Sequence, residues 1–278
     1  MKSRRKLFCE ISPLTYKISV LKCRIIRSIK DFFSSSTFAK ERQKEPLPYL
    51  ICRHNSLIRR KLGNVDSVLQ NNKAVNLGIA APKISCILIK PGEVFSFWRL
   101  VGSCPKRKGY KEGLVIAGGQ TDQNIGGGMC QFTNLIHWMV LHTPMQLTEH
   151  HHHDEWDLFP DFGRQVPFGT GTSIMYNYLD YRFKNTTAMT FQLIVYVTEE
   201  YLCGELRASA PLDVKYHIKA ANEYFYKQDD VVYRHNEIYR ECVDKKTGNL
   251  LGTELLKTND AKVMYDEQDI PADQFREP

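Results

Sequence analysis

The sequence lacks an apolar run long enough for a transmembrane helix. Such a helix needs about 20 consecutive apolar residues, and no stretch of this chain approaches that length. The basic start of the chain is followed by Glu10, Pro13 and Lys17, without a clear small-residue cleavage site. A secretory signal is therefore not expected, and we predict a cytoplasmic protein.

Closely paired cysteines are also missing. No CxxC motif occurs, which argues against a structural zinc site built on cysteine. Wide spacing in a chain of this size favours free thiols in a reducing compartment over a disulfide framework. The eight cysteines are at positions 9, 23, 52, 86, 104, 130, 203 and 242.

Most of the chain has no excess of basic residues. The net charge is +7, but residues 1–40 hold ten Lys or Arg and two acids, a net +8, so the remaining residues sum to −1. A nucleic-acid-binding fold would carry its basic face on the folded body, so no nucleic-acid partner is expected. The 278 residues with 42% hydrophobic content are enough for one sizeable core.

Residues 16–33 are predicted to form a basic amphipathic helix, because apolar residues recur there at spacings of three and four. Such a helix can make peripheral contact with the inner face of an anionic membrane, or it can pack on the domain as an ordinary surface helix. We divide the chain into this helix and a linker (1–45), a main domain (46–215) and a β-rich extension (216–278).

The fold class predicted for the main domain is α+β, with one mixed or antiparallel sheet and a central helix. A polar stretch with apolar residues at helical spacing predicts a helix over about 54–76. A hairpin is expected over 84–98, around the turn Pro91–Gly92. Strands are expected at 145–149, 173–183, 191–197 and 202–208, and weaker ones near 231–234 and 251–256.

The clearest junction in the chain is a glycine run followed by a cysteine and a predicted helix. Glycines permit tight backbone turns, and the open N–H groups of a helix start favour a thiolate and can hold an oxyanion. Cys130 is therefore a candidate nucleophile, although a buried structural cysteine after a tight turn fits the pattern too. The candidate binding residues at this junction are Gly126, Gly127, Gly128, Gln131 and Asn134.

Four consecutive histidines, His150–His153, follow this helix. One of them can serve as the general base for a thiol, or two can bind a metal with a carboxylate. A run of histidines can also bind metal without any function. Asp161 and Asp180 are candidates to orient an imidazole, and Arg164 is a candidate clamp for a substrate carboxylate.

Several motifs, in order, resemble the VanW family over roughly residues 50–210. They include NLGIAAPK from Asn76, IKPGEVFSFW from Ile89, KGYKEG from Lys108, IGGGMCQ from Ile125, LHTP from Leu141 and FPD from Phe159. The resemblance implies a link to glycopeptide (vancomycin) resistance or to cell-envelope biology, and it names no reaction.

Residue by residue, the resemblance covers the glycine–cysteine–glutamine motif and an acidic residue with a histidine pair, here Glu149, His151 and His153. This chain departs from the family in having four histidines in a row and Asp154 where a serine is usual. An aspartate that many relatives carry near Gly171 is absent, which leaves Asp180 as its substitute.

Three functional hypotheses follow. The first is a cofactor-independent cysteine hydrolase or acyltransferase acting on an envelope peptide or peptidoglycan precursor, with Cys130 as nucleophile, His153 or His151 as base and Asp180 as orienting group. The second is a non-catalytic module that binds a peptide or glycan. The third is a metal-binding protein that uses the run His150–His153.

Overall fold

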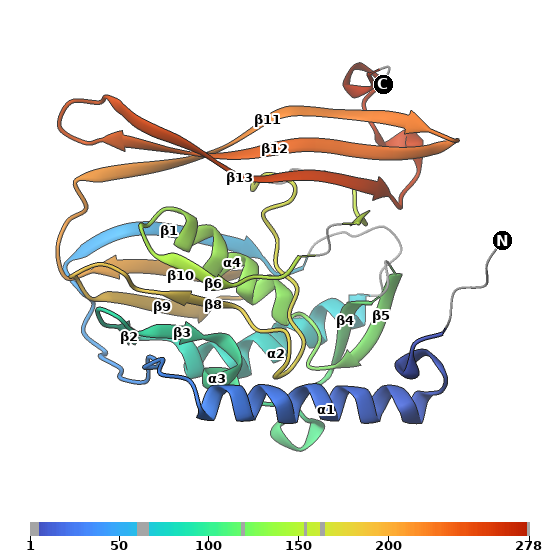
Figure 1. The fold of residues 1–278 in the computed structure, drawn as a ribbon, viewed down its shortest axis with the longest axis horizontal. Coiled ribbons are helices and arrows are strands. Elements are labelled where there is room, and N and C mark those ends of the chain that lie inside the picture. The colour runs from blue at the N-terminus through green and yellow to red at the C-terminus, as the bar shows by residue number, and fades with distance from the viewer. Residues whose placement is uncertain (1–5, 60–66, 118–119, 153–154, 162–164, 277–278) are drawn as a thin grey trace.

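The computed structural model describes residues 6–59, 67–117, 120–152, 155–161 and 165–276. Figure 1 shows three levels: helix α1 along one edge, a central body of sheets and helices, and a sheet of long strands on the opposite side. Among the helices in these ranges, none is long and apolar enough to cross a membrane. The α+β class, the helix after the glycine turn and the N-terminal helix are confirmed.

The elements have the following bounds. The α-helices are α1 (Pro13–Phe32), α2 (Ser67–Ile84), α3 (Phe97–Val101) and α4 (Met129–Leu141). The strands of the body are β1 (Tyr49–Leu57), β2 (Ile87–Ile89), β3 (Val94–Ser96), β4 (Glu112–Ala117), β5 (Gln120–Ile125), β6 (Gln146–Glu149), β7 (Trp156–Asp157), β8 (Arg182–Lys184), β9 (Phe191–Val197) and β10 (Tyr201–Ala208). The last three strands are β11 (Val214–Gln228), β12 (Val231–Asp244) and β13 (Leu250–Val263).

The core of the body lies between a four-stranded sheet and two helices. The sheet has the order β1-β10-β9-β2, and its β10–β9 and β1–β10 pairs are antiparallel. Helices α2 and α4 pack on it, and fully buried side chains such as Leu77, Phe132 and Leu193 fill the space between them. At Gly204 of β10 an added Cβ would meet the Met139 side chain at 2.6 Å, so this glycine lets α4 approach the sheet closely.

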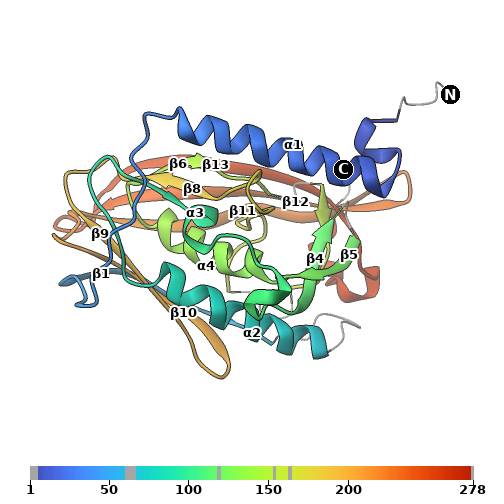
Figure 2. The same cartoon turned by 90° about the horizontal axis from the view of Figure 1, so that it is seen from below.

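Three further strand groups complete the fold. Strands β3, β8 and β6 form one sheet, and β4 and β5 form a two-stranded ribbon beside α2. The long strands β11, β12 and β13 form the sheet seen at the top of Figure 1, and the short parallel pairing of β13 with β7 joins it to the body. In Figure 2 this sheet lies behind the body, with α1 along one side. The strands are thus divided among several sheets, whereas we expected one.

Other local expectations differ from the structure. Residues 54–57 belong to strand β1, and the helix that we placed over 54–76 begins only at Ser67 within the described residues. The expected hairpin over 84–98 is wrong, since β2 pairs with β9 and β3 pairs with β8. Of the expected strand over 173–183, only its end lies in β8, because residues 175–179 turn back on themselves with Asn177 at φ 58°.

Candidate functional site

The glycine run makes the turn that starts α4. Gly126 and Gly128 have φ values of 82° and 99°, a region that side-chain-bearing residues rarely adopt. Gly128 is the N-cap of α4 and offers no side-chain oxygen to the first turn. First-turn N–H groups of a helix have no partner within the helix, so here they must be satisfied by other groups.

Gly127 is needed for a different reason, which is close packing. A Cβ at this position would lie 2.2 Å from the carbonyl carbon of Gly113 in β4. The buried side chain of Asn76 in α2 fastens the two backbones together. Its amide nitrogen donates to the carbonyl oxygens of Gly127 (2.9 Å) and Lys111 (3.0 Å), and its oxygen accepts from the Lys111 N–H (2.8 Å). The position of the turn is thus set by α2 and β4.

Cys130 follows this turn and is a half-buried residue. Burial raises the pKa of this thiol above its ordinary value, although hydrogen bonding to the backbone of Ile174 and to its own backbone acts in the opposite direction. The lowered pKa that we expected from the helix start is therefore wrong, because desolvation of the thiolate outweighs the favourable backbone groups. At neutral pH the thiol is protonated, and a reaction at sulfur requires a proton acceptor.

Cys130, Asn134 and His137 lie on one face of α4, since they are spaced by four and three residues. The side-chain oxygen of Asn134 accepts hydrogen bonds from the N–H (2.7 Å) and the hydroxyl (2.8 Å) of Thr172. The segment 171–174 is thereby held across this face, where Ile174 reaches the thiol. The helical spacing of His137 from Cys130 is a usable signal in the sequence, but the predicted site did not include His137.

His150 and His152 lie beside the same face. A Cβ at Gly171 would lie 2.9 Å from Nε2 of His152 and 3.8 Å from Oδ1 of Asn134, so His152 borders the segment that covers Cys130. The ring of His150 stacks on the buried ring of His137 at 4.4 Å. Burial, and then the neighbouring His150 and His152, hold the pKa of His137 well below its ordinary value. His137 is therefore neutral.

His151 has a different environment from its neighbours. Its Nε2 lies 3.0 Å from Oε1 of Glu149, and both carboxylate oxygens of Glu149 accept hydrogen bonds from Arg27 of α1 at 2.5 Å. Burial alone would raise the pKa of Glu149, but Arg27, the Asp180 N–H and His151 together lower it. Glu149 is thus the carboxylate that contacts His151, and the family resemblance had indicated this residue from the sequence.

Asp180 is buried, and among the described residues its side-chain partners are not histidines. Its carboxylate accepts hydrogen bonds from Ser96 (2.5 Å), from the N–H groups of Trp98 (3.0 Å) and Tyr181 (2.9 Å), and from Arg182 (2.7 Å). These contacts fix the start of α3 to strand β8. The described partners of Asp180 lie in β3, α3 and β8, whereas His153 lies outside the described residues, so the orienting role stays a prediction.

The remaining candidates are occupied elsewhere or not described. The Gln131 amide donates to Ser56 Oγ and to the Leu57 carbonyl, both at 2.8 Å, and so ties α4 to β1. His153 and Arg164 lie outside the described residues. Asp161 forms an ion pair with the buried Arg234 of β12. Within the part of the chain that the structure describes, no group of three or more His, Cys, Asp or Glu side chains is placed to hold a metal ion.

Comparison with known proteins gives two relatives. The "Vancomycin B-type resistance protein VanW" of Enterococcus faecalis is 32% identical over 233 residues, which is 84% of each chain. The "Uncharacterized protein YoaR" of Bacillus subtilis is 27% identical over 117 residues, 41% of this chain and 36% of its own length. The family model described as "VanW like protein" matches residues 72–207. This chain belongs to the VanW family.

The matched region contains the glycine turn, the Cys130 face of α4, the histidine run and the covering segment 171–174. It also contains Glu149 and Asp180, whereas α1 and the sheet β11-β12-β13 lie outside it. No solved structure matches the chain.

Proposed function

We propose that this VanW-family protein is an accessory protein of glycopeptide resistance that acts on a cell-envelope peptide through Cys130. The link to resistance is supported by the 32% identity, over 84% of both chains, with a relative named as a vancomycin B-type resistance protein. The cysteine is supported by its place behind a sterically fixed glycine turn, on a helix face shared with Asn134 and His137.

The proposed chemistry is acyl transfer. The Cys130 sulfur attacks the carbonyl carbon of an acyl-D-Ala-type peptide, and the thiol proton passes to an imidazole. The amine then leaves with a proton, and a thioester remains until water or another acceptor takes the acyl group. We assign the imidazole to His152, because its ring borders the segment that covers Cys130, whereas His151 is paired with Glu149.

The raised pKa of Cys130 favours a second candidate, a module that binds the peptide without reacting. A thiol that stays protonated near neutral pH is a weak nucleophile, and in this case Cys130 would serve as a small apolar residue of the binding site.

Trapping of the acylated protein separates the two candidates. The full chain would be incubated with an activated ester of an acyl-D-Ala peptide and digested, and the peptides would be weighed by mass spectrometry. Acyl transfer predicts a hydroxylamine-labile adduct on Cys130 that forms faster than on the exposed Cys23. It also predicts slower formation in His152→Gln. If saturable peptide binding occurs without an adduct, and persists in Cys130→Ser, the protein is a binding module.

A further inference from the structure

Helix α1 is attached to the body through its polar side. Arg27 pairs with Glu149, and Asp31 accepts two hydrogen bonds of 2.7 Å from Arg182. The Arg24 Nε donates to the Tyr176 carbonyl oxygen at 3.2 Å, and its guanidinium lies 5.0 Å from the centre of the Tyr176 ring. Charged groups therefore fasten this helix to the rest of the protein.

The apolar side of α1 points the other way, into solvent. We call its six residues the apolar row; their spacings of four, three, four, four and three residues place them on one helix face. Phe32 is 82% exposed, Leu14 67% and Ile29 51%. The apolar row consists of Leu14, Ile18, Leu21, Ile25, Ile29 and Phe32.

This orientation is the reverse of the usual one, in which the apolar face of a surface helix packs on the core. No residue of α1 is fully buried. The exposed apolar surface continues beyond both ends of the helix, at Leu7, Phe8 and Ile11 before it and at Phe33 after it. Contiguous apolar surface of this extent is typical of an interaction site.

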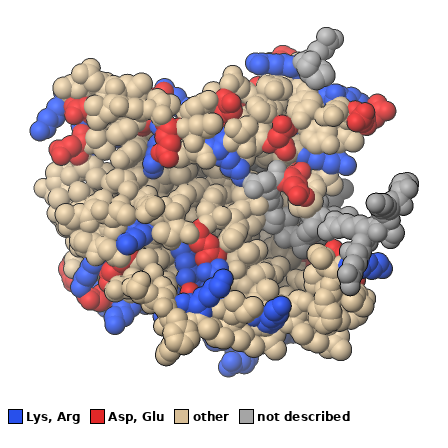
Figure 3. Space-filling view, viewed as in Figure 1, with Lys and Arg blue, Asp and Glu red and all other residues tan. Residues whose placement is uncertain are grey.

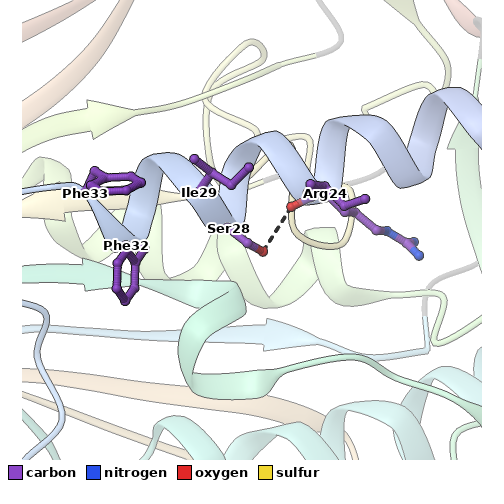
Figure 4. A pocket seen from close by; sticks show the side chains of 6 residues that line it. Arg24, Ser28, Ile29, Phe32 and Phe33 are labelled. Atoms are coloured by element: carbon purple, nitrogen blue, oxygen red, sulfur yellow. Dashed lines mark hydrogen bonds between the residues drawn. The ribbon is translucent and has the colours of Figure 1, made fainter.

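The C-terminal end of α1 shows the surface in detail. Figure 4 shows the rings of Phe32 and Phe33 projecting from the last turn, with Ile29 beside them. The two rings meet edge to face with their centres 5.2 Å apart. Together with Ile25 they border a shallow hollow that has Arg24 at its other end. Aromatic rings at the edge of a basic apolar surface are typical of helices that lie in a membrane interface.

The exposed charged residues of α1 are lysines. Lys17, Lys22 and Lys30 of α1 are exposed, and residues 1–40 carry a net charge of +8. In Figure 3 the surface along the edge that α1 occupies is largely uncharged, with blue patches of Lys and Arg. A second copy of this helix would bring positive charge against positive charge, whereas an anionic lipid surface is complementary.

We propose that α1 docks on a membrane surface rich in anionic lipid, with the apolar row inserted between headgroups and the exposed lysines at the phosphates. The body would be held at a fixed orientation, because Arg27 and Asp31 keep α1 against it. Glu149 contacts both Arg27 and His151, so the docked helix would hold His151 close to the lipid surface. The proposal does not depend on any reaction at Cys130.

The test is flotation of the full chain with vesicles of phosphatidylglycerol and phosphatidylcholine, against vesicles of phosphatidylcholine alone. We expect binding to the anionic vesicles that weakens with added salt. The double variant Ile25→Ser, Ile29→Ser should bind at least about tenfold more weakly, since each loses buried apolar surface. The matched control is Leu251→Ser, Leu255→Ser on β13, where the side chains are 59% and 49% exposed.

Two further measurements keep the test decisive. All four side chains are exposed, so the unfolding midpoints of both variants should equal that of the unaltered protein. Gel filtration without lipid should give a monomer. The proposal is overturned if the chain does not float with anionic vesicles. It is also overturned if the α1 variant and the β13 control bind these vesicles equally well. It is also overturned if the protein is a dimer that only the α1 variant dissociates, because the row is then covered by a second copy.

Discussion

Gly127→Ala should disrupt the turn that positions Cys130. The added Cβ would lie 2.2 Å from the carbonyl carbon, 2.3 Å from the oxygen and 2.7 Å from the Cα of Gly113. Cβ atoms essentially never approach other heavy atoms within 3.0 Å, so the two backbones must separate by about 0.8 Å. Both partners are backbone, so no side-chain rotation relieves the contact. We expect a loss of about 3 kcal/mol in the free energy of unfolding, the upper end for overpacking.

The matched control is Gly78→Ala in α2, where a Cβ meets no atom within 4 Å. Alanine is a better helix former than glycine, so this change should stabilise the protein by about 0.5–1 kcal/mol. Urea unfolding followed by circular dichroism gives both values. The steric reasoning is refuted if Gly127→Ala is as stable as the unaltered protein, or if the two substitutions have the same effect.

Three other changes should follow from the same contacts. Asn76→Ala removes the partner of the Lys111 N–H and of the buried Gly127 carbonyl, and it should lower the free energy of unfolding in urea by about 3 kcal/mol. Asn71→Ala, at an exposed position of the same helix, should change it by less than about 0.5 kcal/mol. The pKa of Glu149 is lower in the folded protein than in the unfolded chain, where it is about 4.3, so the ionised carboxylate stabilises the fold. This stability is present above about pH 4.3 and is lost as the pH falls through the pKa of the folded protein. Glu149→Gln should therefore lower the melting temperature at pH 7, and the melting temperature of the variant should fall less steeply between about pH 5 and 3. If the variant's melting temperature falls as steeply as that of the unaltered protein, the ionised Glu149 does not contribute to stability. In the free protein, iodoacetamide should modify Cys130 more slowly than the exposed Cys23 at pH 7, because the Cys130 pKa is raised; faster labelling of Cys130 would contradict that direction.

Local patterns in the sequence were enough to locate helices α1 and α4. Apolar spacing predicted a helix over 16–33, and the structure has α1 at Pro13–Phe32. The glycine run predicted the start of α4 just before Cys130. These features depend on residues close together in the chain, which is why they can be read without knowledge of the fold.

Pairings between distant residues were not predictable in the same way. Strands β2 and β3 adjoin in sequence, which suggested a hairpin, but each pairs with a strand roughly a hundred residues later. The hydrogen bonds of Asp180 to β3, α3 and β8 join elements about eighty residues apart in the chain, and no local pattern around Asp180 indicates them. Periodicity also identified the apolar face of α1 without showing that its polar face is the one that contacts the body.

The direct test of the proposed function is vancomycin resistance in cells whose only copy of this protein carries Cys130→Ser. Cys23→Ser, at an exposed position on α1, is the matched control, and protein levels would be compared by immunoblot. We expect Cys130→Ser to lower resistance to the level of a strain without the protein, whereas Cys23→Ser should retain it. Full resistance with Cys130→Ser at normal protein levels would contradict a role for the thiol.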